Sequence, residues 1–332
     1  MTIVRVEDIW LWVRFVGQNL MNNSSFFFRG QSNSQWMIES TFEREYGTGE
    51  KSDSIHGSTL VEGRLRAQER RLLTQFVRDA WKYNSNNFGG GKTKVEWYSL
   101  MRHYGIPTRM VDFTESALIA LYFALIDCDT KHGFAVWCVD SKVLGNVEIQ
   151  KRINKEASFN HSLDVMRRLN GGGRHKANRE SPRRCMGIYY NAISAISANE
   201  EFAESILGDE IDDSKFKDVG LDIIHFIPKR RNARMGAQSG LFLMPTHLNT
   251  SFMEVLQGTC NSSAESCSTN TTKKIALTAE NVESMQIDSI VKFEFNANLK
   301  DEGRRLLRMA NITPRTVYPD IEGVAKELRG EY

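Results

Sequence analysis

The chain has 332 residues, enough for one large or two modest domains, because a single hydrophobic core seldom grows beyond about 250–300 residues. Its hydrophobic content of 41% and charged content of 25% are ordinary for a globular protein, which excludes disorder as the default. With 43 Lys and Arg against 41 Asp and Glu, the formal charge is +2. This near balance argues against a protein that binds nucleic acid over its whole surface and against a polybasic membrane protein.

The N-terminal third begins with apolar positions at helical spacing, and an amphipathic helix is expected from Val6 to Leu20. The aromatic run Phe26 to Phe28 favours a strand that ends at Arg29-Gly30. We expect a second extended piece from Trp36 to Phe42 and a long helix from Leu60 to Tyr83.

The middle of the chain is its most unusual part. A shorter helix is predicted from Val95 to His103, and Thr108 to Phe113 reads as a strand or an extended segment after a Gly/Pro turn. Thr114 is the expected cap of a helix whose interior, Ala117 to Leu125, is apolar on nearly every face. Such a helix must be buried.

The second half predicts further strands and helices. Strands are expected over 134–139, 221–227, 241–244 and 290–295, the last as an edge or half-buried strand, and helices over 300–309 and 321–328. Residues 140–220 read as a helical insertion and residues 258–272 as a surface loop. We therefore predict one α+β domain over 1–332, with a mixed or antiparallel sheet core and helical decoration.

Metal, disulfide and membrane signals are weak. The five cysteines are scattered and show no zinc-type spacing, so we expect no metal and no oxidised framework. The N-terminus lacks signal-peptide features, and the longest apolar stretch, Ala117 to Ile126, is too short to cross a bilayer. The expected location is cytoplasmic, with no membrane partner.

Three segments place polar groups among apolar neighbours, and the first is Phe26 to Gln31. An arginine after a buried aromatic run must find an anion, because an unpaired buried guanidinium is costly. Arg29 therefore either grips a phosphate or carboxylate or forms a structural salt bridge, with Asp112 as one partner. Gly30 permits the close approach of a ligand or of another backbone.

The second segment runs from His103 to Ser116. The start of its buried helix, near Glu115, exposes free N–H groups that favour an anion, and Thr114 and Ser116 can donate to a bound oxygen. His103 is a candidate acid/base or stacking group. The alternative is that Asp112 only caps the helix or pairs with Arg109.

The third segment runs from Arg230 to Phe242. Arginines including Arg234 precede Gln238, whose amide can orient a substrate through both its oxygen and its nitrogen. A surface turn with solvated arginines is the competing interpretation.

Together these motifs resemble the FRG-domain family, named for a Phe/Tyr-Arg-Gly motif. The motif reads Phe28-Arg29-Gly30 here, followed by Gln31 and then Trp36, and the long run HYGIPTRMVDFTESALIALYFAL from His103 is similar to the second hallmark. The segment from Arg234 to Phe242 and the ending ITPRTVYPDIEGVAKEL are also similar to the family. The resemblance implies a component of bacterial stress or anti-phage systems.

The motif order is also similar to that of ADP-ribosyltransferases, which would make the fold ADP-ribosyltransferase-like. In those enzymes a first-strand Arg holds the NAD phosphates, a middle segment steadies the ribose and a Glu on a late strand drives transfer. Arg29, then Thr114 with Ser116, then Gln238 occupy matching places in order. Gln238 departs from the pattern, because a neutral amide cannot act as a carboxylate does.

Three functions stay open: an NAD- or nucleotide-acting effector, a non-catalytic module that senses a nucleotide or phage component, and an interaction scaffold. For the first, NAD is the expected substrate, with a protein or nucleic-acid target. The basic stretch Arg167 to Arg184 either tracks phosphates or is a solvated loop. The predicted catalytic residues are Arg29, Asp112 and Gln238, and the predicted substrate-binding residues are Gly30, Gln31, His103, Thr108, Arg109, Thr114, Glu115, Ser116 and Arg234.

Overall fold

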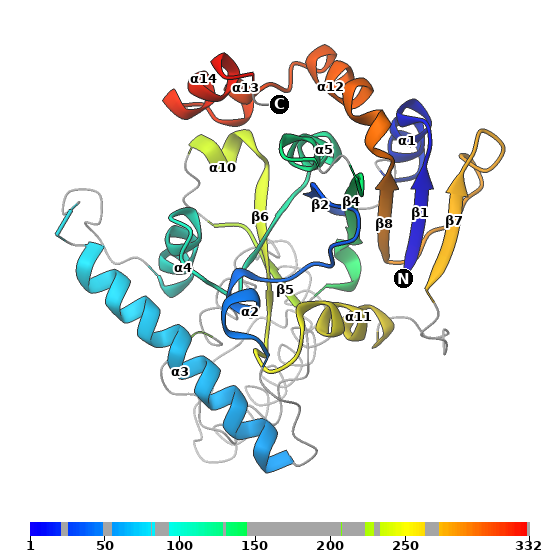
Figure 1. The fold of residues 1–332 in the computed structure, drawn as a ribbon. Coiled ribbons are helices and arrows are strands. Elements are labelled where there is room, and N and C mark those ends of the chain that lie inside the picture. The colour runs from blue at the N-terminus through cyan, green and yellow to red at the C-terminus, as the bar shows by residue number, and fades with distance from the viewer. Residues whose placement is uncertain are drawn as a thin grey trace, which may run out of the picture.

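The computed structural model describes residues 1–20, 26–48, 55–80, 82–83, 93–128, 131–144, 207, 223–228, 233–262 and 272–330. Within these ranges the strands form one eight-stranded sheet in the order β5-β6-β3-β2-β4-β8-β1-β7, with helices around it (Figure 1). The expected α+β class is therefore confirmed.

The sheet is mixed. β1 runs parallel to both β7 and β8, whereas the β2–β3, β2–β4, β3–β6, β4–β8 and β5–β6 pairs are antiparallel. The strands are β1 (Thr2–Val6), β2 (Phe26–Gln31), β3 (Val111–Thr114), β4 (Phe134–Asp140), β5 (Ile223–Phe226), β6 (Gly240–Pro245), β7 (Lys273–Leu277) and β8 (Ile290–Phe295).

The edge position expected for β8 is wrong, because β8 lies between β4 and β1. Its alternating pattern is typical of a half-exposed strand, but the polar residue Lys292 is 3% exposed. The ammonium group donates to the carbonyl of Ser34 and pairs with Glu294 at 3.4 Å. Local partners thus allow a charged residue to occupy an interior strand.

Helices are present where they were expected over 95–103, 117–125, 300–309 and 321–328, and the helix expected over 60–83 begins earlier and ends at Ala80. The helical elements are α1 (Ile9–Phe15) with the π-helical turn Val16–Leu20, α2 (Thr41–Tyr46), α3 (Ile55–Ala80), α4 (Lys94–His103), α5 (Ala117–Ile126), the 3-10 turn Ser141–Val143, α10 (Ala233–Ala237), α11 (Phe252–Ser262), the 3-10 turn Ala297–Leu299, α12 (Lys300–Met309), α13 (Pro314–Val317) and α14 (Ile321–Leu328).

Three local expectations need correction. The extended piece over Trp36 to Phe42 is wrong at its end, because Ser40 forms a capping box with Glu43 and starts α2. Ser116, not Thr114, caps α5, accepting from the backbone N–H of Ile119. The loop expected over 258–272 begins too early, because α11 continues to Ser262. Residues 263–271 and most of the predicted insertion over 140–220 lie outside the described residues.

The apolar helix α5 lies on one face of the sheet, together with α1 and α12 (Figure 1). Its closest neighbour is β2, where Gly30 is required by packing. A Cβ atom at Gly30 would lie 1.9 Å from the carbonyl oxygen of Ala120 and 2.6 Å from the backbone nitrogen of Ala124. The close approach that Gly30 permits is therefore that of the α5 backbone.

The opposite face of the sheet is covered by α11. Phe252, Val255 and Leu256 of this helix join a buried cluster with Phe27 and Trp137 from β2 and β4. Phe28 packs with α5 on one face and Phe27 packs with α11 on the other, so both faces of β2 are covered and the position of Arg29 on this strand is fixed. None of the helices in the described part of the chain is long and apolar enough to cross a bilayer.

Candidate functional site

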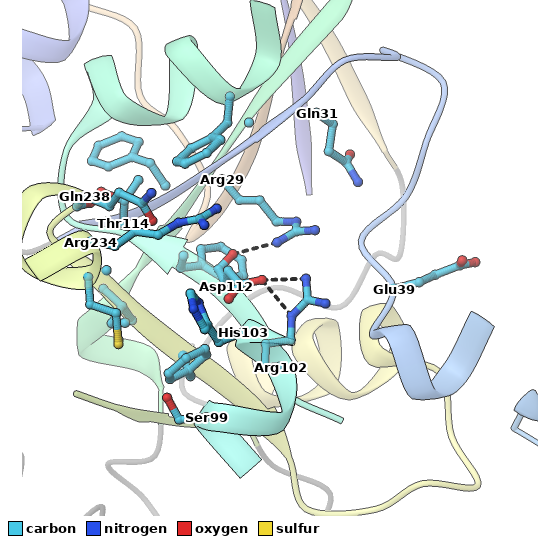
Figure 2. A pocket seen from close by; sticks show the side chains of 18 of the residues that line it. Arg29, Gln31, Glu39, Ser99, Arg102, His103, Asp112, Thr114, Arg234 and Gln238 are labelled. Carbon is cyan, nitrogen blue, oxygen red and sulfur yellow. Dashed lines mark hydrogen bonds and ion pairs between the residues drawn. The ribbon is translucent and has the colours of Figure 1, made fainter. Parts of the chain in front are cut away.

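A cavity of about 960 Å³ opens beside the central strands. β2 and β3 share a single register pair, Phe28 with Thr114, and both strands contribute to the cavity wall. The remaining walls come from the segment after β2, from α4, and from α10 with the start of β6 (Figure 2). The polar lining residues are Arg29, Gln31, Ser32, Gln35, Glu39, Arg44, Glu96, Ser99, Arg102, His103, Asp112, Thr114, Arg234 and Gln238.

Arg29 extends from β2 toward β3 and donates from Nη1 to the backbone carbonyl of Asp112 at 2.7 Å (Figure 2). Its Nε is buried and has no hydrogen-bond partner within the described residues. Burial lowers the pKa of Arg29 to about 10, so the group stays protonated at pH 7. The guanidinium is therefore a partly buried cation with one buried, unused donor in the described part of the chain.

The carboxylate of Asp112 is bound by Arg102 of α4. Arg102 donates from Nε at 2.8 Å, and its Nη2 lies 2.5 Å from the same carboxylate oxygen (Figure 2). The sequence left open whether Arg29 or Arg109 pairs with this carboxylate. The partner is Arg102 instead. Arg29 uses the main chain of Asp112, and Arg102 uses its side chain.

The surroundings of Arg29 carry an excess of positive charge. The Asp112 carboxylate raises the pKa of Arg29, whereas Arg102 and Arg44 both lower it. Asp112, the acidic group that acts on Arg29, is already paired with Arg102. An anion entering the cavity beside Arg29 would relieve this repulsion and satisfy the free donor.

The α10 wall brings Gln238 and Arg234 to the cavity through contacts with the C-terminal helices. The Gln238 amide nitrogen donates to the carbonyl of Val317 at 3.2 Å. Arg234 lies 4.3 Å over the ring of Tyr318 and pairs with Glu322 at 3.2 Å. Gln238 precedes β6 at the end of α10, so it is not a strand residue.

Thr114 joins the two sides of this wall. Its hydroxyl donates to the carbonyl of Gln238 at 2.7 Å and accepts from the N–H of Ser116 at 3.0 Å. These contacts hold the end of β3 against α10. Gln31 is held similarly, because its amide nitrogen donates to the Met37 carbonyl at 3.0 Å and its oxygen accepts from Trp137 at 2.6 Å.

Of the predicted site residues, Arg29, Gly30, Gln31, His103, Asp112, Thr114, Arg234 and Gln238 line this one cavity. His103 is an exposed residue at the end of α4 and contacts Tyr104 edge-on. The structure therefore brings together side chains from all three of the segments that the sequence singles out.

Four predicted site residues do not line the cavity. Arg109 is 1% exposed and binds Glu69 of α3 at 2.5 Å, which gives it a structural partner far from β2. Thr108 is fully buried, and its N–H donates to Thr41. Glu115 points to solvent, and Ser116 caps α5.

The sequence did not single out Arg102, Arg44 or Trp36 as site residues. Arg102 carried one usable signal, since it precedes His103 directly in the long family-like motif. Arg44 lies on α2, whose capping box at Ser40 and Glu43 was overlooked. No group of three or more His, Cys, Asp or Glu residues is placed to hold a metal within the described ranges.

The fold and the cavity define an α+β protein with an arginine-rich cavity at the centre of a mixed sheet. Residues 24–132 match the family model of the FRG domain, which agrees with the motif resemblance over this part of the chain. This match spans β2 to α5 and includes Arg29, Arg102 and Asp112. The comparisons with curated proteins and with solved structures gave no significant match.

Proposed function

We propose that the cavity binds a phosphate-bearing nucleotide, with NAD as the first candidate, and that Arg29 is the anion-binding residue. One observation carries this proposal: Arg29 is a partly buried cation whose buried Nε meets no acceptor among the described residues, with Arg102 and Arg44 nearby. A phosphate group offers several acceptor oxygens and the negative charge that this environment lacks.

Two forms of this function differ in whether a bond is broken. In the enzymatic form, the bond between nicotinamide and ribose of NAD breaks and nicotinamide leaves. Water or a target nucleophile then takes the ADP-ribosyl group and gives up a proton. Asp112 or Gln238 would orient the reacting centre, with Thr114 near the ribose. The protein would act as a cytoplasmic effector in bacterial stress or anti-phage defence.

In the second form, the cavity binds a nucleotide or phage component without turnover. A specific observation favours it: the Asp112 carboxylate is held by Arg102, and the Gln238 amide is held by the carbonyl of Val317. Neither group is a free general base, and general base catalysis needs a proton acceptor within reach of the reacting group. Both forms share the anion site at Arg29.

The test compares nucleotide binding by wild type, Arg29→Met and Arg14→Met in calorimetry with NAD and ADP-ribose. Arg14 is an exposed arginine outside the cavity, paired with Glu283, and serves as the matched control. We expect Arg29→Met alone to lose binding while retaining its circular dichroism spectrum. Equal affinities for all three proteins would contradict the proposal.

Measuring nicotinamide release during prolonged incubation with NAD separates the two forms. Release that depends on Arg29 identifies the enzyme, whereas binding without release identifies the sensing module. In host cells challenged with phage, an effector role predicts that protection disappears with Arg29→Met and persists with Arg14→Met.

A further inference from the structure

The segment from Ser32 to Met37, directly after β2, forms a wall of the cavity and presents two large apolar side chains to it. Trp36 is 53% exposed and Met37 is 42% exposed, and both belong to the cavity lining. An indole ring left half in water is an unfavourable use of a large apolar surface, unless a partner covers it.

Hydrogen bonds hold this segment at its ends and in its middle. Gln31 binds the Met37 carbonyl and accepts from the indole N–H of Trp137. In the middle of the segment, the Ser34 N–H donates to the Gly133 carbonyl at 3.2 Å, and the Ser34 carbonyl accepts from the buried Lys292. Lys292 in turn lies over the Trp137 ring at 5.1 Å.

A fixed backbone that presents an exposed aromatic ring is suited to ligand binding. The entropy cost of ordering this segment is already met by its own contacts, so a ligand that covers Trp36 gains apolar burial with little further ordering. The cavity volume of about 960 Å³ lies within the range of pockets that enclose whole cofactors. Planar aromatic ligands stack well on indole.

We propose that Trp36 is the base-recognition residue of the cavity: it stacks on the nucleobase of a ligand whose phosphate binds Arg29. This inference rests on the proposed nucleotide site and deepens it, since it assigns the ligand class as base-bearing nucleotides rather than phosphorylated sugars. Gln31 and Lys292 are positioning residues, because they hold the backbone on either side of Trp36.

The experiment measures the affinities of ADP, ribose 5-phosphate and inorganic pyrophosphate for the full chain by calorimetry. Wild type should bind ADP more tightly than either base-free ligand. Trp36→Ala should weaken ADP binding by about 5- to 150-fold, the range for loss of one base–aromatic stack, and leave pyrophosphate binding unchanged. Trp36→Phe keeps a ring and should retain most of the ADP affinity.

Two variants control for loss of apolar surface. Trp36→Leu is apolar but not planar and should behave like Trp36→Ala. Trp10→Ala removes an indole of similar exposure, 45%, on α1 outside the cavity, and should bind all three ligands as wild type does.

The outcomes separate this inference from the proposed function. If pyrophosphate binds through Arg29 but ADP binds no more tightly, or if Trp36→Ala weakens both ligands equally, the base-recognition role is wrong and the anion site stands. If wild type binds none of the three ligands, the anion site and the base-recognition role both fail.

Discussion

Arg29 and Arg109 were both predicted as site residues, but the structure gives them different partners. Both are drawn into low-polarity surroundings, but Arg109 meets the carboxylate of Glu69 in a buried pair with exposures of 1% and 2%. Burial alone would lower the pKa of Arg109, and the charge and hydrogen bonds of Glu69 raise it above the ordinary value. Arg29 instead donates from Nη1 to the main-chain carbonyl of Asp112, and its Nε has no partner among the described residues.

Replacing Arg109 with Met should destabilise the protein by about 3–5 kcal/mol, because it leaves the Glu69 carboxylate buried without its counter-charge. Chemical denaturation measures the loss. The control is Arg78→Met, since Arg78 is 70% exposed and lies 3.7 Å from Asp79, and its removal should change stability by less than about 0.5 kcal/mol. If the free energy of unfolding of Arg109→Met lies within about 1 kcal/mol of the wild-type value, this structural role is wrong.

Gly30 belongs to the same scale, although it contributes no side chain. Gly30→Ala places a methyl group 1.9 Å from the Ala120 carbonyl oxygen, and the three nearest atoms all belong to the backbone of α5. We expect a large fall in melting temperature or failure to fold, because neither backbone can move cheaply. Gly17→Ala, where no atom lies within 4 Å of the added methyl, should fold normally, and a well-folded Gly30→Ala protein would disprove the packing argument.

At the scale of elements, β5 is the strand at one end of the sheet order, and among the described strands it pairs with β6. It carries His225, whose ring lies 5.2 Å from that of Phe27. Burial lowers the pKa of His225 to about 4, from an ordinary value of 6.5. The folded protein therefore keeps this side chain neutral where the unfolded chain would protonate it.

This difference predicts the pH dependence of stability. Between pH 6.5 and about 4 the unfolded chain binds the proton and the folded protein does not, so stability is full above 6.5 and falls as the pH falls. The lowered pKa of His225 predicts a loss of about 3 kcal/mol in the free energy of unfolding below pH 4, at 1.36 kcal/mol per pKa unit. Denaturation of wild type and His225→Gln at pH 7 and pH 4.5 should show a smaller loss in the variant; equal losses would rule out His225 as the cause.

Elements with a long regular pattern were the most predictable. The 10-residue helices α5 and α12 match their expected positions because apolar residues or amphipathic periodicity extend over several turns. The short strands β1 and β7 were not predicted. β7 begins with two exposed lysines, and only pairing with β1 orders it as a strand.

At the scale of the whole molecule, the sheet and the cavity both extend beyond residues 24–132. β2 pairs with β4, β3 pairs with β6, and the α10 wall supplies Arg234 and Gln238, all from outside the matched range. Among its described residues, the matched range contributes the strands β2 and β3, which share one register pair. We infer that the neighbouring strands are needed to complete the structural unit.

A fragment of residues 24–132 should therefore lack a cooperative unfolding transition, because β2, β3 and the helices α2 to α5 lose the strands and helices that cover their apolar surfaces. Circular dichroism during urea titration of the fragment and of the full chain measures the difference. A sharp transition in the fragment, with a slope proportional to its size, would show instead that the matched range folds alone.

The sequence by itself determined the α+β class, the long helices and the three segments that carry Arg29, Asp112 and Gln238. These properties depend on periodicity and on the contrast between polar groups and apolar neighbours, both of which are local. Tertiary structure alone decided the partners: Arg102 for Asp112, Glu69 for Arg109 and the backbone of α5 for Gly30. Partner choice depends on distances between segments far apart in the chain, and composition and spacing do not encode those distances.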